Sequence, residues 1–193
     1  MYKVKVISLV RRKDRRKLFK KTFGELFPFE FVNAIDGKKY ELTKEDSELI
    51  KGNEYHKYGI HIPSLVAANR THLQLLTECS QDSVPYVIME DDAKLIKDFN
   101  IDFDRLSNRK LDVYWLMEKE PSILAYMVWP SGAKKLLKLI YEEYKLPTGL
   151  DWSFLDIRNR NILNQDEIDE AFVYQIPGQD SDITESEFYR VVD

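Results

Sequence analysis

The stretch Tyr86-Val87-Ile88-Met89-Glu90-Asp91-Asp92 joins a short apolar run to three consecutive acids. An apolar run of this length, bounded by polar residues, is typical of a buried strand. In an α/β protein, ligands bind beyond the carboxyl ends of such strands. Adjacent carboxylates repel one another, and a divalent cation or water relieves that repulsion. The stretch therefore predicts either a metal-binding strand end or a solvated acidic turn.

Outward from this strand, apolar runs alternate with helical patterns. Strands are predicted at residues 4–9, 29–34, 84–89, 113–116, 125–129 and 171–176. Helices are predicted at about residues 13–27, at 64–80 with Ser64 as N-cap, and from Pro130 to the break at Pro147 and Gly149. Residues 38–63 and 97–110 are expected to be irregular. The alternation predicts an α/β fold, in which helices flank a mostly parallel central sheet, as one domain over residues 1–193.

Helical spacing also predicts which side chains pack. Phe19, Phe23 and Phe27 recur every fourth residue, and with Leu18 and Leu26 they are expected to form one apolar stripe. In the last predicted helix, the core-facing residues are expected to be Ala133, Leu136, Leu137, Ile140 and Tyr144.

Composition narrows the class of protein. The chain has 193 residues, 44% of them apolar, and no apolar run approaches the roughly 20 residues that cross a bilayer. The lone cysteine, Cys79, excludes an internal disulfide and is expected to pack in the core. The first residues are too charged for a secretory signal. We therefore expect a cytoplasmic globular protein.

Basic residues concentrate near the N-terminus, although the net charge is −4. Residues 11–21 hold eight Lys or Arg and one acid, Asp14. Such a run is typical of the solvent-facing side of a helix, and it also suits contact with phosphates, an anionic acceptor or a peripheral membrane surface. Nucleic acid is not an expected partner, because the patch is short and the protein is acidic.

Two residues besides the acidic run, Asp151 and His72, are candidates for chemistry. Strand alternation would point Glu90 and Asp92 one way and Asp91 the other, with Asp92 the first choice of metal ligand. Asp151 precedes Trp152, an aromatic residue suited to stacking on a sugar, so it is a candidate general base or the N-cap of a helix that starts at Trp152. His72 lies on an apolar helix face, where it is either a core histidine or a site residue.

Several short motifs match one family in chain order. Val6-Ile7-Ser8-Leu9, followed by Asp14-Arg15, is similar to its opening strand and arginine, with Ser8 in place of the usual asparagine. Ala34-Ile35-Asp36-Gly37 matches its Ala-x-Asp-Gly turn, and Met89-Glu90-Asp91-Asp92 matches its Glu-Asp-Asp metal motif. The segment from Leu65 to His72 aligns with its Gly-Cys-x-x-Ser-His helix, in which Ala67, Ala68 and Thr71 are replacements and His72 is retained.

Later matches are Ala125-Tyr126, Gly132-Ala133, Leu136-Leu137, Leu150-Asp151, and Gln179 followed by Ser181-Asp182-Ile183. Together the motifs resemble glycosyltransferase family 25 over nearly the whole chain. That family contains bacterial lipooligosaccharide glycosyltransferases and the collagen galactosyltransferase domain. The compact segment between Leu116 and Ala125 is expected to affect the acceptor side more than the donor side. The replacement of Gly-Cys on the helix is expected to alter how closely the helix approaches the donor.

The resemblance implies a GT-A-like fold and a hexosyltransferase that uses a UDP-linked donor, such as UDP-galactose or UDP-glucose, with inversion at the sugar. It implies Mn²⁺ or Mg²⁺ as cofactor, a glycan hydroxyl as acceptor, and a place in lipopolysaccharide biosynthesis. The implied metal residues are Glu90, Asp91, Asp92 and Asp182, and the implied base is Asp151. The implied donor-binding residues are Ser8, Leu9, Arg15, Ala34, Asp36, Gly37, His72, Gln179 and Ser181.

Two other classes of function are compatible with the sequence. One is a non-catalytic module on the same fold that binds a glycan or membrane through residues 11–21. The other is a metal-dependent phosphohydrolase built on the acidic strand end.

Overall fold

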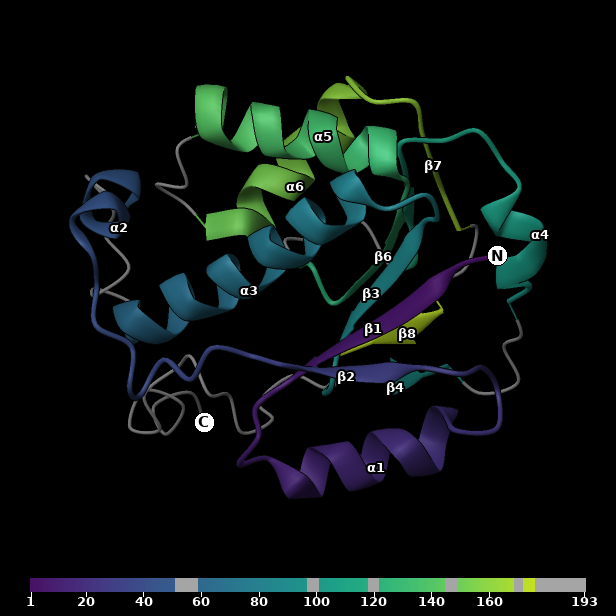
Figure 1. Ribbon diagram of the computed structural model, residues 1–193, viewed down its shortest axis with the longest axis horizontal. Helices are drawn as coiled ribbons and strands as arrows, with labels where there is room; N and C mark the ends of the chain where they lie inside the picture. The colour runs from purple at the N-terminus through teal and green to yellow at the C-terminus, as the bar shows by residue number, and fades with distance from the viewer. Residues whose placement is uncertain (51–58, 97–100, 118–121, 145–148, 169–171, 176–193) are drawn as a thin grey trace, which may run out of the picture.

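The computed structural model describes residues 1–50, 59–96, 101–117, 122–144, 149–168 and 172–175. It has a central six-stranded sheet with helices on both faces (Figure 1). The strand order is β2-β1-β3-β6-β5-β7. The strands are β1 (Lys3–Ser8), β2 (Glu30–Asn33), β3 (Tyr86–Glu90), β5 (Val113–Trp115), β6 (Ala125–Val128) and β7 (Gln165–Glu167).

The sheet is mostly parallel. β1 runs parallel to both β2 and β3, and β5 runs parallel to β7, whereas β6 is antiparallel to its neighbours β3 and β5. The carboxyl ends of β1, β2 and β3 therefore meet at one edge. This confirms the expected α/β class with a mostly parallel sheet flanked by helices.

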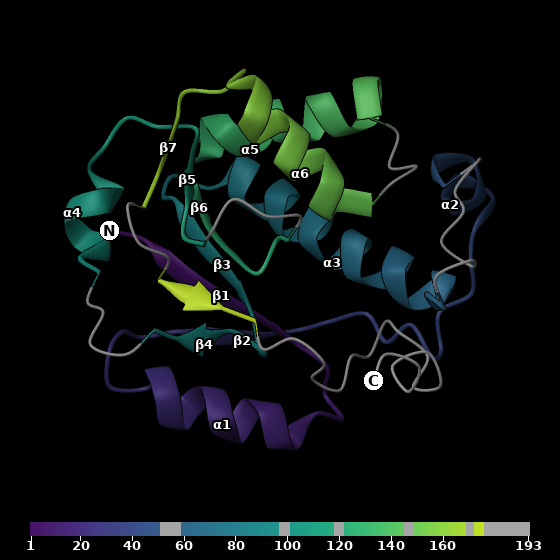
Figure 2. The same cartoon turned by 180° about the vertical axis from the view of Figure 1, so that it is seen from behind.

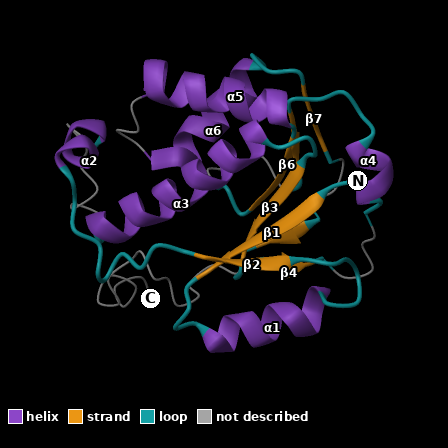
Figure 3. Cartoon of the chain, in the orientation of Figure 1, coloured by secondary structure: helices purple, strands orange, loops and turns teal. Residues whose placement is uncertain are grey.

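Helices lie on both faces of the sheet (Figure 3), and on each face a layer of apolar side chains holds them there. On one face pack α3 (Ile62–Gln81), α5 (Pro130–Leu139) and α6 (Gly149–Arg160). On the other face lies α1 (Lys13–Phe23), together with a small sheet of β4 (Lys94–Leu95) and β8 (Val173–Tyr174), as Figure 2 shows. Because both faces are covered, β3 is buried along most of its length, which explains its continuous apolar sequence.

The apolar stripe of α1 is confirmed only in part. Phe19, Phe23 and Phe27 are buried and contact one another, but Leu18 and Leu26 are 43% and 49% exposed, so their assignment to the stripe was wrong. The helix also ends at Phe23 rather than near residue 27. Gly24, a poor helix former, follows it, and the chain turns before Pro28.

Other boundaries differ from the prediction. The helix predicted at 64–80 begins two residues earlier, at Ile62. Its N-cap is His61 rather than Ser64, and Pro63 lies in its first turn, a position that tolerates proline. The segment expected to be irregular at 38–63 contains α2 (Lys44–Leu49), and the one at 97–110 contains α4 (Phe103–Ser107). The α5 helix continues as a π-helical turn, η2 (Ile140–Tyr144). Of the residues predicted to face the core from α5 and η2, Ala133, Leu136 and Ile140 are fully buried.

Candidate active site

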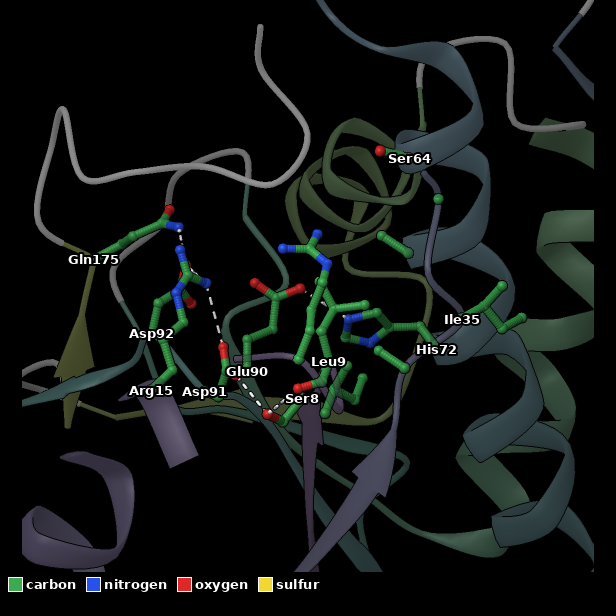
Figure 4. Close-up of a pocket in the computed structure, with 15 residues that line it drawn as sticks. Ser8, Leu9, Arg15, Ile35, Ser64, His72, Glu90, Asp91, Asp92 and Gln175 are labelled. Carbon is green, nitrogen blue, oxygen red and sulfur yellow. Dashed lines mark hydrogen bonds and ion pairs between the residues drawn. The ribbon is translucent and has the colours of Figure 1, made fainter. Parts of the chain in front are cut away.

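A pocket opens where β1, β2 and β3 end, at the edge that the fold predicts for a ligand (Figure 4). Strand ends supply one side, and one row of α3 supplies the other. The lining residues are Ile7, Ser8, Leu9, Arg11, Arg15, Ala34, Ile35, Gly37, Ser64, Ala68, His72, Glu90, Asp91, Asp92 and Gln175.

Arg15 joins the two aspartates of the acidic run. Its Nη1 atom lies 3.2 Å from Asp91 Oδ1 and 3.2 Å from Asp92 Oδ2. The strand ends at Glu90, and the chain turns at Asp91 and Asp92, so strand alternation does not apply to them. The expectation that Asp91 points away from Asp92 was therefore wrong: both carboxylates reach one guanidinium, while Glu90 contacts His72.

One carboxylate oxygen in this cluster lacks a hydrogen-bond partner among the residues that the structure describes. Asp92 Oδ2 accepts hydrogen bonds from Arg15 and from Gln175 Nε2, the latter at 2.9 Å. Asp92 Oδ1 is buried and has no hydrogen-bond partner among the described residues. A buried carboxylate oxygen is costly to leave unpaired. The atom is thus a ready ligand for a cation in the pocket.

Ser8 holds Asp91 in place from β1. Its hydroxyl donates to Asp91 Oδ2 at 2.6 Å and accepts from Arg16 Nε at 3.0 Å. Arg16 also donates to the Ser8 carbonyl and to Asn33 Oδ1, which ties the ends of β1 and β2 together. Serine at position 8 therefore still orients an acid of the cluster.

His72 is a buried histidine that also reaches the site. Its Nε2 lies 3.1 Å from Glu90 Oε1, and its Nδ1 lies 3.2 Å from the Tyr126 hydroxyl. Burial lowers the pKa of His72 to about 4, so the ring is neutral at pH 7. Burial, together with the charges of Asp92 and Asp91, raises the pKa of Glu90. The two interpretations of His72 are thus compatible, because a core histidine positions a site carboxyl group.

Asp151 lies in the first turn of α6, behind this pair. The helix begins at Gly149, so Asp151 is inside it and is not the N-cap of a helix that starts at Trp152. Burial and the negative charge of Glu90 raise the pKa of Asp151 to about 7, against the opposing effect of His72. Leu150 N–H donates to Asn69 Oδ1 of α3, which anchors this turn beside His72. Asp151 is not among the residues that line the pocket.

The loop after β2 lies close against α3. A Cβ atom on Gly37 would lie 2.2 Å from Ser64 Cα, so only glycine fits this approach. Ser64, Ala68 and His72 are spaced by four residues and present one row of α3 to the pocket. The small side chains at 64 and 68 leave the pocket open above His72.

Most predicted site residues come together. Those that line the pocket are Ser8, Leu9, Arg15, Ala34, Gly37, His72, Glu90, Asp91 and Asp92. Asp36 is next to it and accepts a hydrogen bond from Arg11 Nε at 3.1 Å. Gln179, Ser181 and Asp182 lie outside the described residues, so their predicted roles stay predictions.

Sequence reasoning missed Ile7, Arg11, Ile35, Ser64, Ala68 and Gln175 as pocket residues. The four-residue spacing of Ser64 and Ala68 before His72 was a usable signal for two of them. Gln175 carried no local signal, because the pairing of β8 with β4 brings it to Asp92.

The carboxylates of Asp91 and Asp92 suit a metal ion that is also coordinated by a bound ligand better than a metal ion coordinated by protein alone. Within the described ranges, no three His, Cys, Asp or Glu side chains are grouped to hold a metal ion. Mg²⁺ in enzymes is commonly held by one or two carboxylates together with substrate phosphates and waters. The free Oδ1 atom of Asp92, beside Asp91, suits that kind of coordination.

Comparison with known proteins agrees with this geometry. The family described as "Glycosyltransferase family 25 (LPS biosynthesis protein)" matches residues 1–120, which include His72 and the acids at 90–92. The chain belongs to glycosyltransferase family 25. Family membership makes it a glycosyltransferase and disfavours both the non-catalytic module and the phosphohydrolase. Asp151 lies beyond the matched residues.

Comparisons with curated sequences and with solved structures do not narrow the function further. No curated protein sequence matches the chain. A solved structure described as "crystal structure of a glycosyltransferase involved in the glycosylation of the major capsid of PBCV-1" is similar, with 10% identity and a TM-score of 0.44. The alignment covers 87% of this chain and 81% of that one. Among the described helices, none has the length and apolarity needed to span a membrane.

Proposed function

We propose that this family 25 glycosyltransferase moves a hexose from a UDP-linked donor, such as UDP-galactose or UDP-glucose, to a hydroxyl of a glycan, with inversion. The observation that carries the proposal is the meeting of three strand ends around Arg15 and the acids at 90–92, where one buried Asp92 oxygen has no hydrogen-bond partner in the described part of the chain. The family's description as an LPS biosynthesis group suggests a lipopolysaccharide-type acceptor.

The donor would occupy the pocket between the strand ends and α3. The diphosphate would lie near Arg11 and Arg15, whose guanidinium groups match phosphate oxygens. The backbone at Ser8, Leu9 and Ala34 would border the nucleoside, and Gly37 would let it lie close to the chain. Asp36 would hold Arg11 through their ion pair.

Asp92, with Asp91 beside it, would hold Mn²⁺ or Mg²⁺. The bound cation would supply positive charge to the departing diphosphate. Ser8 fixes the orientation of Asp91, and Gln175 fixes that of Asp92. Glu90 is directed to His72 instead, so its role is to position the wall of the pocket.

Asp151 is the proposed base. The acceptor oxygen would attack the anomeric carbon as the bond between that carbon and the diphosphate oxygen breaks. The acceptor proton would pass to the Asp151 carboxylate, and UDP would leave. A base is most effective when its pKa lies near the working pH, and the pKa of Asp151 is about 7.

Trp152 is the proposed acceptor platform. Its side chain is 54% exposed although it is a large aromatic group, and it is adjacent in sequence to Asp151. Aromatic faces stack on the apolar faces of sugars, so the exposed ring would hold the acceptor near the base.

A thermal-shift panel of sugar nucleotides with Mn²⁺ would test the donor, because a ligand that binds only the folded state raises the melting temperature. UDP-hexoses should shift the transition, whereas CMP- and GDP-sugars should not. Turnover with the selected donor, followed by NMR of the product anomer, would test inversion. No shift with any UDP-sugar would contradict the proposal.

A further inference from the structure

The basic residues at 11–21 divide into two groups in the structure. The four arginines are engaged within the protein. Arg11 pairs with Asp36, Arg12 with Asp14, Arg15 with Asp91 and Asp92, and Arg16 with Ser8 and Asn33. These arginines build the site and its border, so they are not a free binding surface.

The four lysines of the same run form an outward face, which we call the lysine face: Lys13, Lys17, Lys20 and Lys21. All four are exposed, and none forms an ion pair with a described residue. Lys13, Lys17 and Lys21 are spaced by four residues and share the side of α1 that faces away from buried Phe19 and Phe23. Lys20 is at the border of this face, with its Nζ 5.8 Å from the centre of the Phe31 ring.

An apolar side chain and an ionised acid that pairs with an arginine complete this face. Leu18 lies three residues before Lys21, at the edge of the lysine face, and is 43% exposed. Asp14, the only acid within α1, accepts two hydrogen bonds from Arg12, and this contact lowers its pKa to about 2. The local charge is therefore strongly positive on a protein whose net charge is −4.

We propose that the lysine face docks on an anionic lipid surface. Positive side chains are attracted to anionic headgroups, and each lysine near such a surface raises partitioning about fivefold. An exposed leucine at the edge of the lysine face favours a bilayer over a soluble anionic polymer, because a bilayer offers apolar depth beneath its charges.

The position of α1 relative to the pocket indicates what docking on a lipid surface would do. Figure 1 shows α1 as the outer layer of the molecule, beneath the sheet. The same helix carries Arg15 into the pocket. If the proposed function holds, docking through α1 would bring the pocket close to lipid-linked glycan acceptors. The docking itself does not depend on that function.

Vesicle sedimentation tests the proposal with the full chain. The wild type should bind vesicles of phosphatidylglycerol and phosphatidylcholine, should not bind phosphatidylcholine alone, and should be released by high salt. The double variant Lys17→Gln/Lys21→Gln should lose about 25-fold in partitioning, from about fivefold per lysine. A matched variant, Lys134→Gln/Lys138→Gln, removes the same charge from exposed lysines of α5 and should bind like the wild type.

A second variant separates a membrane from a polymer. Leu18→Gln should weaken vesicle binding and leave binding to heparin unchanged. The proposal is overturned if the wild type does not bind anionic vesicles, if both double variants lose affinity equally, or if heparin binds as strongly as vesicles and Leu18→Gln has no effect. Binding to UDP should be the same in Lys17→Gln/Lys21→Gln as in the wild type, so failure of docking is distinguishable from failure of the catalytic proposal.

Discussion

Replacing Asp151 by asparagine should make the enzyme more stable and much less active. Burial and Glu90 raise the pKa of Asp151 from 3.8 to about 7. The folded protein therefore holds a proton that the unfolded chain releases above pH 4. Its stability falls as pH rises from about 4 to 7, because the carboxylate is disfavoured in the fold.

The expected gain in stability of Asp151→Asn follows from the shift in the pKa of Asp151. About three pKa units correspond to up to about 4 kcal/mol of unfolding free energy at pH 8. Asparagine resembles the neutral acid, so Asp151→Asn should be more stable than the wild type at pH 8 and nearly equal to it at pH 4. A gain in stability with a loss of activity is typical of a functional residue.

Activity should change in the opposite direction. Loss of a general base costs about 10²- to 10⁴-fold in turnover. Wild-type kcat should rise with pH through about 7, and the residual rate of the variant should lack that rise. Urea unfolding at pH 4 and pH 8, together with kcat over the same range, would measure both effects.

A control lies on the same helix. Asp156→Asn changes an exposed carboxylate that accepts a hydrogen bond from Tyr144, and it should leave the pH profile unchanged. The reasoning about Asp151 would be refuted if Asp151→Asn retained wild-type kcat, or if it were less stable than the wild type at pH 8.

Three further substitutions test the fold and the site. Asp46→Asn breaks an ion pair between the fully buried Asp46 and the half-buried Arg70, and it should lower the free energy of unfolding by about 3 kcal/mol in urea titrations; a loss below about 1 kcal/mol would contradict this. Gly37→Ala places a methyl group 2.2 Å from Ser64 Cα, so the loop after β2 must shift away from α3. Calorimetry should therefore show weaker UDP binding; unchanged affinity would contradict this. Trp152→Ala should raise KM for the acceptor and not for the donor; equal changes in both would exclude the platform role.

The positions of the apolar strands could be predicted well from the sequence, because an apolar run of this length indicates a buried strand. The short strands β4 and β7 were not predicted, because they carry no such run. The strands containing Val87 and Met127 are buried on both faces, and their sequences have no polar interruption. The Phe19 and Phe23 stripe could be read in the same way. The exposure of Leu18 and Leu26 could not be predicted, because an apolar residue at the border of a stripe can face either the core or the solvent.

Local chemistry explains some of the missed elements. Thr43 and Asp46 form a capping box at the start of α2, and this three-residue spacing was present in a segment expected to be irregular. The start of α3 was placed at Ser64 instead of Ile62, because serine is the commoner cap.

Site residues that belong to a motif at the end of a strand could be predicted from the sequence. Contacts between residues far apart in the chain could not. Glu90, Asp91 and Asp92 are consecutive, so their cluster was visible in the sequence. The guanidinium of Arg15 between two of them and the amide of Gln175 on Asp92 depend on packing between elements far apart in the chain. The sharp turn after Glu90 likewise decided where the aspartates point.

The central claim is that Asp92 holds a cation that in turn binds the diphosphate. Calorimetry with UDP tests it most directly, with Mn²⁺ present or replaced by a chelator. The account predicts tight binding by the wild type only with Mn²⁺, no effect of Mn²⁺ in Asp92→Asn, and wild-type behaviour in the control Asp104→Asn on α4. Equal UDP affinity with and without metal in the wild type, or wild-type metal dependence in Asp92→Asn, would contradict it.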